Sequence, residues 1–197
     1  MLGIKEEKHL IVASDVHNDE QSFSLLAEKA ENENCLGFLY AGDLNIENCM
    51  ISAILQCRNF LFIPVQGNCD NRWKWTDVGL DLPLYRTCSF NGLRIFLSHG
   101  HLYGEPGSAG LPDTDFDLVI TGHTHRNDIH EQFIDGKRVV YLNPGSTSRP
   151  RGYSKASYAM VFFNKDGSVS FEIRALDGDS VLSQKTVSFH QAPVGDN

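Results

Sequence analysis

The feature that most limits the fold of this chain is the alternation, over its first third, of short apolar runs with amphipathic segments. Single helices between short buried strands are typical of βαβ units, whose strands lie parallel in one sheet. The pattern predicts three strands at residues 9–15, 36–43 and 60–68, and two helices at residues 22–32 and 46–57.

The second half of the chain is rich in hairpin signals. Turn residues separate pairs of alternating segments, as a two- or three-residue hairpin loop requires. We expect hairpins over residues 82–100, 128–146 and 157–176, turning at Asn91-Gly92, Asp135-Gly136 and Lys165-Asp166-Gly167. A βα half followed by a hairpin half predicts an α/β fold. We expect a four-layer α/β/β/α sandwich of two mixed β-sheets flanked by helices.

The chain is long enough for one domain with a substantial core, and a second domain is not required. We expect a single domain over residues 1–180. Residues 181–197 are polar and are expected to form a C-terminal tail, with one short edge strand at Thr186–Phe189.

Composition excludes several partners. A formal net charge of -8 argues against an extended nucleic-acid surface and against an anionic membrane. No apolar run approaches a membrane span and no signal peptide is apparent, so a cytoplasmic protein is expected. The odd number of cysteines and the lack of a CxxC pair favour reduced thiols. These cysteines are Cys35, Cys49, Cys57, Cys69 and Cys88.

Polar side chains with metal-binding chemistry follow five of the predicted strands. Ligands bind at the carboxyl ends of strands in open α/β sheets, so these side chains are expected to converge. They are Asp15, His17, Asp43, Asn68, His99, His101, His123 and His125. In an extended segment, His123 and His125 would point the same way, because they lie two residues apart.

These donors combine oxygen and nitrogen without needing a cysteine, which suits Mn, Fe, Zn, Co or Ni better than Ca. There are more of them than one ion can use, which favours two metals bridged by a carboxylate. Singly, Asp15 or Asp43 is equally well explained as a helix cap and Asn68 as a turn residue. Their joint occurrence at consecutive strand ends favours the metal site.

The motifs that carry these residues resemble those of the calcineurin-like metallophosphoesterases. They are DVH (15–17), GD (42–43), GNCD (67–70), SHGH (98–101) and GHTH (122–125). The flanking segments HGHLYG (99–104) and LNPGSTSRP (142–150) are similar to small single-domain bacterial and archaeal phosphodiesterases of the YfcE type. The resemblance covers roughly residues 9–176, and five motifs in register are far more specific than any one of them.

The resemblance implies a metal-dependent phosphodiesterase with two divalent cations, Mn first and Fe, Ni, Co or Zn as alternatives. It places one ion on Asp15, His17, Asp43 and His125, and the other on Asp43, Asn68, His99 and His123. Asp43 bridges the ions, and a hydroxide between them attacks phosphorus in line. The implied catalytic residues are Asp43, Asn68 and His101, with His101 at the edge of the site near a metal or the substrate phosphate.

One position departs from many family members, which carry a histidine immediately after the Asn of the third motif. This chain has Cys69 there, as its small subgroup tends to. An ordinary thiol has a pKa of about 8.5 and is a poor substitute for an imidazole poised near neutrality. We therefore expect weaker catalysis on alkyl leaving groups than on acidic ones such as nitrophenol.

Two other functions fit the same residues. One is a non-catalytic scaffold that keeps the fold but binds protein, as the small subunit of retromer does. The other is a phosphomonoesterase, which differs only in the outer pocket. The expected ligand is a small phosphodiester. The exposed edges of the hairpins could pair with another copy of the chain, so a homodimer or a homotetramer is possible.

Three further features have two interpretations each. Trp73 and Trp75 either form a wall beside the site or pack on the domain surface. Arg149 and Arg151 either meet the second ester group of a substrate or are solvated loop charges. The segment from Asn143 to Ser146 is expected to shape a loop rather than perform chemistry.

Overall fold

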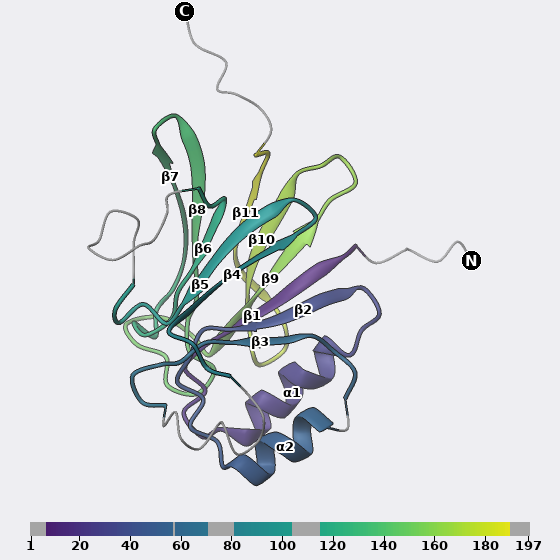
Figure 1. Cartoon of the computed structure of the whole chain (residues 1–197), viewed down its shortest axis with the longest axis vertical. Helices are drawn as coiled ribbons and strands as arrows, with labels where there is room; N and C mark the ends of the chain where they lie inside the picture. Colours follow the sequence, from purple (N-terminus) through teal and green to yellow (C-terminus); the bar gives the residue numbers. More distant parts are fainter. Residues whose placement is uncertain (1–6, 57, 71–80, 104–114, 190–197) are drawn as a thin grey trace, which may run out of the picture.

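The chain was analysed as a computed structural model, which describes residues 7–56, 58–70, 81–103 and 115–189. Two β-sheets face each other, and two helices lie along the outer side of the first sheet (Figure 1). The predicted Trp73 and Trp75 lie outside the described residues, as does Cys57.

The first sheet has six strands in the order β11-β10-β9-β1-β2-β3. Its parallel part is β1, β2 and β3, and the other neighbours in it pair antiparallel. The strands are β1 (His9–Ala13), β2 (Cys35–Tyr40), β3 (Phe62–Pro64), β9 (Ser157–Phe163), β10 (Val169–Ala175) and β11 (Val181–Val187).

The second sheet has five strands in the order β4-β5-β6-β8-β7. Here β5, β6 and β8 are parallel neighbours, while β4 and β7 pair antiparallel at the two edges. The strands are β4 (Tyr85–Phe90), β5 (Leu93–Ser98), β6 (Leu118–Ile120), β7 (Asn127–Ile134) and β8 (Lys137–Pro144). Both sheets are therefore mixed, as predicted.

The alternation of side chains along each strand builds two apolar layers. Leu10 and Val12 of β1 join the core between the sheets, where they meet β5 side chains such as Ile95. Ile11 and Ala13 point the other way, into the layer formed with the helices. This period of two places apolar side chains of β1 in both layers, so the strand is buried on both faces.

The helices are α1 (Glu20–Ala30) and α2 (Asn48–Gln56), and their apolar side chains pack on the first sheet. Phe23 of α1 contacts the rings of Phe38 and Tyr40 at centroid distances of 5.9 and 6.0 Å. In the described ranges no helix covers the second sheet, so three of the four predicted layers are present there.

The three predicted hairpins are confirmed, and their turns have the backbone conformation that the residue types predict. Asn91 and Gly92 join β4 to β5 with φ values of 48° and 84°. Asp135 and Gly136 join β7 to β8 with φ values of 50° and 77°. Two consecutive positive φ values are typical of a type I′ turn.

The C-terminal strand is longer than the sequence indicates. We expect an edge strand at Thr186–Phe189, whereas β11 runs from Val181 to Val187 and pairs with β10. Edge strands bury little, and along β11 only Val187 is fully buried. The apolar signal of this strand is therefore weak in the sequence.

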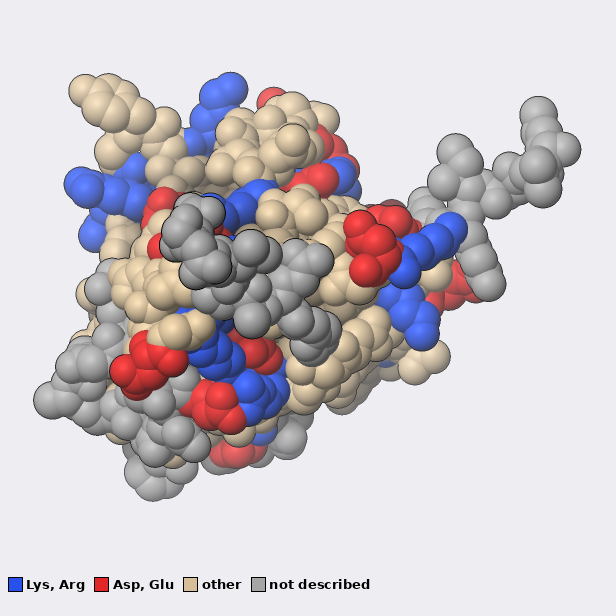
Figure 2. All heavy atoms as spheres, turned by 90° about the horizontal axis from the view of Figure 1, so that it is seen from above, with Lys and Arg blue, Asp and Glu red and all other residues tan. Residues whose placement is uncertain are grey.

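The surface carries no strong field of one sign on the face shown in Figure 2, where acidic and basic side chains are interspersed. No helix among the described residues is long and apolar enough to cross a membrane.

Candidate metal centre

Five loops meet where the parallel strands of the two sheets end. The loop after β1 carries Asp15 and His17, and the loops after β2 and β3 carry Asp43 and Asn68. The second sheet contributes the loops after β5 and β6. These carry His99, His101, His123 and His125.

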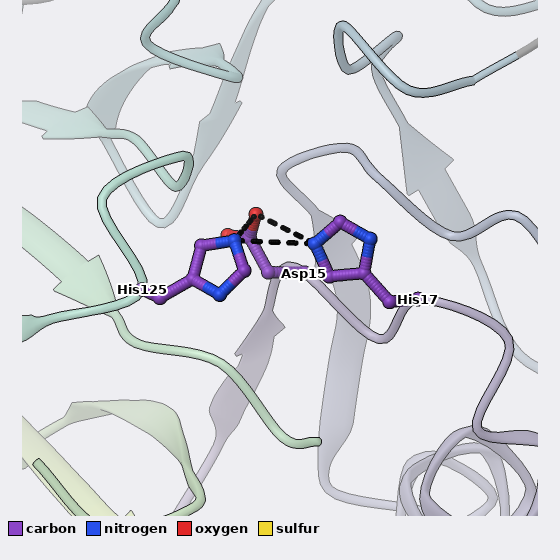
Figure 3. A group of neighbouring side chains, drawn as sticks. All are labelled: Asp15, His17 and His125. Carbon is purple, nitrogen blue, oxygen red and sulfur yellow. Dashed lines mark hydrogen bonds and ion pairs between the residues drawn. The ribbon is translucent and has the colours of Figure 1, made fainter. Parts of the chain in front are cut away.

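The first donor group consists of Asp15, His17 and His125 (Figure 3). The two imidazole rings flank the carboxylate, and their Nε2 atoms lie 3.1 Å apart. Asp15 Oδ1 lies 3.2 Å from the Nε2 of His125 and 3.8 Å from that of His17.

The two oxygens of Asp15 have different roles. Oδ2 accepts hydrogen bonds from Ser14 Oγ at 2.6 Å and from the backbone N–H of His123 at 2.9 Å. Oδ1 is buried and accepts no hydrogen bond within the described chain. A buried carboxylate oxygen without a donor is costly, and a cation held between it and the two imidazoles removes that cost. These residues therefore fit a metal ion.

The second donor group is built around Asp43. Its Oδ2 lies 3.4 Å from His99 Nε2 and 3.7 Å from His17 Nε2, so it faces both groups of ligands. His99 Nε2 also lies 3.0 Å from Asn68 Oδ1. A further donor group joins Asp15, Asp43 and His99. The position of Asp43 between the two groups is the one that a bridging carboxylate needs.

Hydrogen bonds on the far side of two rings fix which nitrogen faces the site. His99 Nδ1 bonds to the carbonyl of Ala41, and His125 Nδ1 to that of Arg149, both at 2.7 Å. Ring N–H groups held by carbonyls leave each Nε2 free to bind a metal.

Burial and neighbouring groups together set the protonation of the ligands. Burial lowers the pKa of His17, so this imidazole is neutral and able to coordinate at pH 7. Burial raises the pKa of the Asp43 carboxyl, but the hydrogen bond and the charge of His99 outweigh it and hold that pKa far below its usual range. Asp43 is therefore an anion at neutral pH.

Two predicted residues lie outside these donor groups. The ring of His123 has its centroid 5.2 Å from that of His99, and the ring of His101 lies 5.3 Å from the same centroid. The buried His101 Nδ1 has no hydrogen-bond partner in the described chain. Burial and the neighbouring charges of His99 and His123 lower the pKa of His101.

The backbone at the ligands is left-handed. Five donor residues have positive φ, namely Asp15 (54°), His17 (46°), Asp43 (60°), His123 (66°) and His125 (59°). The expectation that His123 and His125 share one side of an extended segment is wrong, because neither residue is extended. Their rings reach different neighbours, His99 for the first and Asp15 for the second. Such backbone costs of order 1–3 kcal/mol per residue and clusters at functional sites.

A close approach of two loops explains the glycine of the third motif. A Cβ added to Gly67 would lie 2.0 Å from Asp43 Oδ1 and 2.3 Å from Asp43 N. Only a residue without a side chain lets the loop after β3 lie against the carboxylate of Asp43.

Asp70 organises the site, although from the sequence it was named only as the last residue of the GNCD motif. Its buried carboxylate accepts hydrogen bonds from four backbone N–H groups. Three belong to the loop after β2 and one to the loop after β3: Asp43 (2.8 Å), Leu44 (2.9 Å), Asn45 (3.2 Å) and Gly67 (2.8 Å). Its place two residues after Asn68, in GNCD, is the only signal that the sequence offers.

The segment from Asn143 to Ser146 was predicted to shape a loop, but Asn143 lies in β8 and it and Ser146 hold neighbouring loops. Asn143 Nδ2 donates to the carbonyl of Gly122 at 2.8 Å, which holds the loop that carries His123. Ser146 Oγ donates to the carbonyl of Asp15 at 2.7 Å.

Cys69 lies within reach of the metal ligands. Its backbone N–H donates to Asp43 Oδ1 at 2.8 Å, and its thiol forms a donor group with His17 and Asp43. Burial and the adjacent Asp43 raise the pKa of this thiol to about 11. The thiol is therefore protonated at neutral pH.

Residues 9–166 match the family described as the calcineurin-like phosphoesterase superfamily domain. The chain belongs to this family. Phosphodiesterase YfcE of Escherichia coli K12 is 32% identical over 129 residues. The match covers 64% of this chain and 63% of that protein, which is less than two thirds of its length.

Solved structures show the same fold over nearly the whole chain. The phosphoesterase YfcE from E. coli superposes with a TM-score of 0.72 and 23% identity, covering 92% of this chain and 99% of that one. Vacuolar protein sorting 29 from Cryptosporidium parvum gives a TM-score of 0.68 at 18% identity, covering 92% and 98%. The chain therefore shares both the family's sequence pattern and its two-sheet fold.

Proposed function

We propose that this chain is a metal-dependent phosphodiesterase with a dinuclear centre. The observation that carries the proposal is the pair of donor groups around Asp15 and Asp43, with one buried carboxylate oxygen that has no hydrogen-bond donor. The similarity to the phosphodiesterase YfcE supports the reaction class.

The donors that would hold the metals are those of the two groups. Asp15, His17 and His125 would hold one ion, His99 and Asn68 the other, and Asp43 would bridge them. His123 completes the second set by family resemblance. Two bound divalent cations would lower the pKa of a water molecule and offset charge on the phosphoryl oxygens. Mn is the proposed metal, with Fe, Ni, Co and Zn as alternatives, because mixed imidazole and carboxylate ligands suit all of them.

Three residues would act on the reacting groups. Asp43 fixes the two ligand sets relative to each other, since its Oδ2 faces His17 and His99. The amide of Asn68 and the neutral ring of His101 would contact the phosphate. His101 is suited to donating a hydrogen bond, because its buried Nδ1 has no partner in the described chain.

The protonated thiol of Cys69 is a weak acid for a leaving group. With a pKa near 11, it gives its proton to an alkoxide much less readily than an imidazolium does. Esters of acidic alcohols, which leave as anions without a proton, are the proposed good substrates.

A protein-binding scaffold is the second candidate function. The observation that favours it is the fold shared with vacuolar protein sorting 29. Fold alone does not define function, and this alternative predicts metal binding without turnover. A phosphomonoesterase would use the same centre and differ in its preference for the monoester.

A small phosphodiester is the proposed ligand, acted on in the cytoplasm by a single-domain enzyme. The free thiols of Cys35, Cys69 and Cys88 support a reducing compartment. Edge strands β3, β4, β7 and β11 offer surfaces for a homodimer or homotetramer.

The test is hydrolysis of bis-p-nitrophenyl phosphate against p-nitrophenyl phosphate, after removal of metal and addition of Mn²⁺. Asp43→Asn and His99→Ala are expected to lose activity, and Asp135→Asn, in a distant hairpin turn, to keep it. Faster hydrolysis of the monoester would indicate a phosphomonoesterase. Stoichiometric metal binding with no turnover on Mn, Ni, Co, Fe or Zn would favour the scaffold.

A further inference from the structure

Three arginines near the metal centre lack the ion pairs that the other described arginines make. Five arginines are paired with carboxylates: Arg58, Arg86, Arg94, Arg138 and Arg174. Arg126, Arg149 and Arg151 form no ion pair with any described residue, and all three are exposed. In a chain with a net charge of -8, unpaired arginines on the loops beside His125 are candidates for binding an anion.

These arginines are tied to the loop that holds a metal ligand. The backbone N–H of Arg151 donates to the carbonyl of His125 at 3.1 Å. Arg126 follows His125 directly, and its Nε would lie 3.5 Å from a Cβ added to Gly152. The side chain of Arg126 therefore runs beside the turn that carries Arg151, and the backbone of Arg151 is held at the same loop.

Arg126 and Arg151 line one groove of about 560 Å³. The same groove is lined by Gly100 and Gly122, which lie within the two histidine motifs. Its lining has one carboxylate, Asp128, which is engaged by His130 Nδ1 at 2.5 Å. The groove therefore connects the loops of the metal centre to two cationic groups.

We propose that Arg126 and Arg151 bind a second phosphate of the substrate, carried by the alcohol that the scissile phosphodiester joins. This inference rests on the proposed function, because it places the scissile ester at the metal centre. The substrate class is then a phosphodiester with a phosphorylated substituent, such as an ester of a nucleoside phosphate. Two guanidinium groups match phosphate well, since each offers paired N–H donors and permanent charge.

The test compares two chromogenic esters with the same leaving group. Thymidine 5′-(p-nitrophenyl phosphate) has only the scissile phosphate, and its 3′-phosphorylated form adds the second one. We expect kcat/KM to be higher by about tenfold or more for the 3′-phosphorylated ester. The increase is expected to come from a lower KM rather than from a higher kcat. In Arg126→Gln/Arg151→Gln the ratio of the two values is expected to fall to about one. Lys165→Gln removes an unpaired cation that does not line the groove, and is expected to keep the parent ratio.

Binding of products gives a readout that does not depend on turnover. Calorimetry with metal-loaded protein is expected to show tighter binding of thymidine 3′,5′-bisphosphate than of thymidine 5′-monophosphate, and the arginine variant to lose that preference. Equal affinities in the parent, or a preference that survives in the variant, would overturn the proposal. The parent protein could also prefer the bisphosphate, and the variant lose this preference, while neither ester is hydrolysed. That result would support phosphate binding by the two arginines and refute the proposed phosphodiesterase activity.

Discussion

At the residue scale, the chemistry of Cys69 would set the choice of leaving group in the proposed phosphodiesterase. A pKa of about 11 leaves the thiol protonated but reluctant to release its proton. Cys69→His would place an imidazole beside Asp43, and we expect hydrolysis of alkyl diesters to rise by about tenfold or more. Hydrolysis of bis-p-nitrophenyl phosphate should change far less, because nitrophenolate leaves without a proton. The ratio of the two rates checks this, and an unchanged ratio would count against the role of Cys69.

Asp70 is the residue whose loss should affect the centre without removing a ligand. Its four accepted N–H groups hold the loops of Asp43 and Asn68 together. We expect Asp70→Ala to weaken Mn²⁺ binding by about 10- to 100-fold and to lower the stability of metal-free protein by roughly 2 kcal/mol or more. Asp70→Asn should fall between, since it keeps one acceptor oxygen.

Metal titration and thermal unfolding measure both effects of the Asp70 variants. Asp81→Ala, which removes only an exposed ion pair with Arg86, is the matched control. Parent-like metal affinity in Asp70→Ala would show that the loops keep their positions without this carboxylate.

At the scale of elements, the turn between β10 and β11 is held by one carboxylate. Asp179 accepts a hydrogen bond from Tyr158 and pairs with Lys29 of α1 at 3.4 Å and with Arg174 at 3.3 Å. Burial alone would raise the pKa of Asp179. The hydrogen bond from Tyr158 and the charge of Lys29 have a larger effect in the opposite direction, so the pKa of Asp179 is lowered.

A lowered carboxyl pKa stabilises the folded state above the unfolded pKa of about 3.9 and loses that effect as pH falls through the folded value. Asp179→Asn should therefore melt below the parent at pH 7, and the difference in Tm should shrink below about pH 4. Asp135→Asn replaces a turn aspartate of similar φ without ion pairs and serves as control. A difference in Tm that is constant from pH 7 to pH 3 would contradict this account.

The last strand tests where the domain ends. A boundary at residue 180 stays a prediction, and β11 begins one residue later. A chain ending at 180 would expose the edge of β10 and remove the contact of Phe189 with Phe171, whose ring centroids lie 6.5 Å apart. We expect a lower Tm in thermal unfolding. We also expect the shortened chain to associate more as its concentration rises, which light scattering measures. A chain ending at 189 is the control, and equal Tm values would support the boundary at 180.

The sequence predicts the elements that bury apolar residues or use special turn chemistry, and it misses those that do neither. The first three strands and the three hairpins were predictable, whereas β11 was placed at its last residues only. The ligand types were predictable because metals require particular atoms. The role of Asp70 and the left-handed backbone of His123 depend on contacts between segments far apart in the chain, which no local pattern contains.

At the scale of the whole molecule, metal binding and folding should be coupled, because the ligands come from loops more than 100 residues apart, such as Asp15 and His125. A ligand that binds only the folded state at a hundredfold excess over its Kd adds about 2.7 kcal/mol. For a chain of this size, we expect Mn²⁺ to raise Tm by roughly 5–10 °C and EDTA to reverse the rise.

In this measurement Asp43→Asn and His99→Ala should lose most of the shift, while Lys165→Gln keeps it. A shift of the same size in all four proteins would mean that Mn²⁺ binds elsewhere.

The left-handed backbone at five donor positions also restricts how the site can change during evolution or in a designed library. Asparagine, aspartate, histidine and glycine tolerate this conformation, whereas valine, isoleucine and threonine do not. In a library that randomises all twenty residues at Asp15 or Asp43, the β-branched substitutions would therefore be strained, whatever their chemistry. Exchanges within the tolerant group are the route by which the metal preference of this centre can drift while the chain keeps its shape.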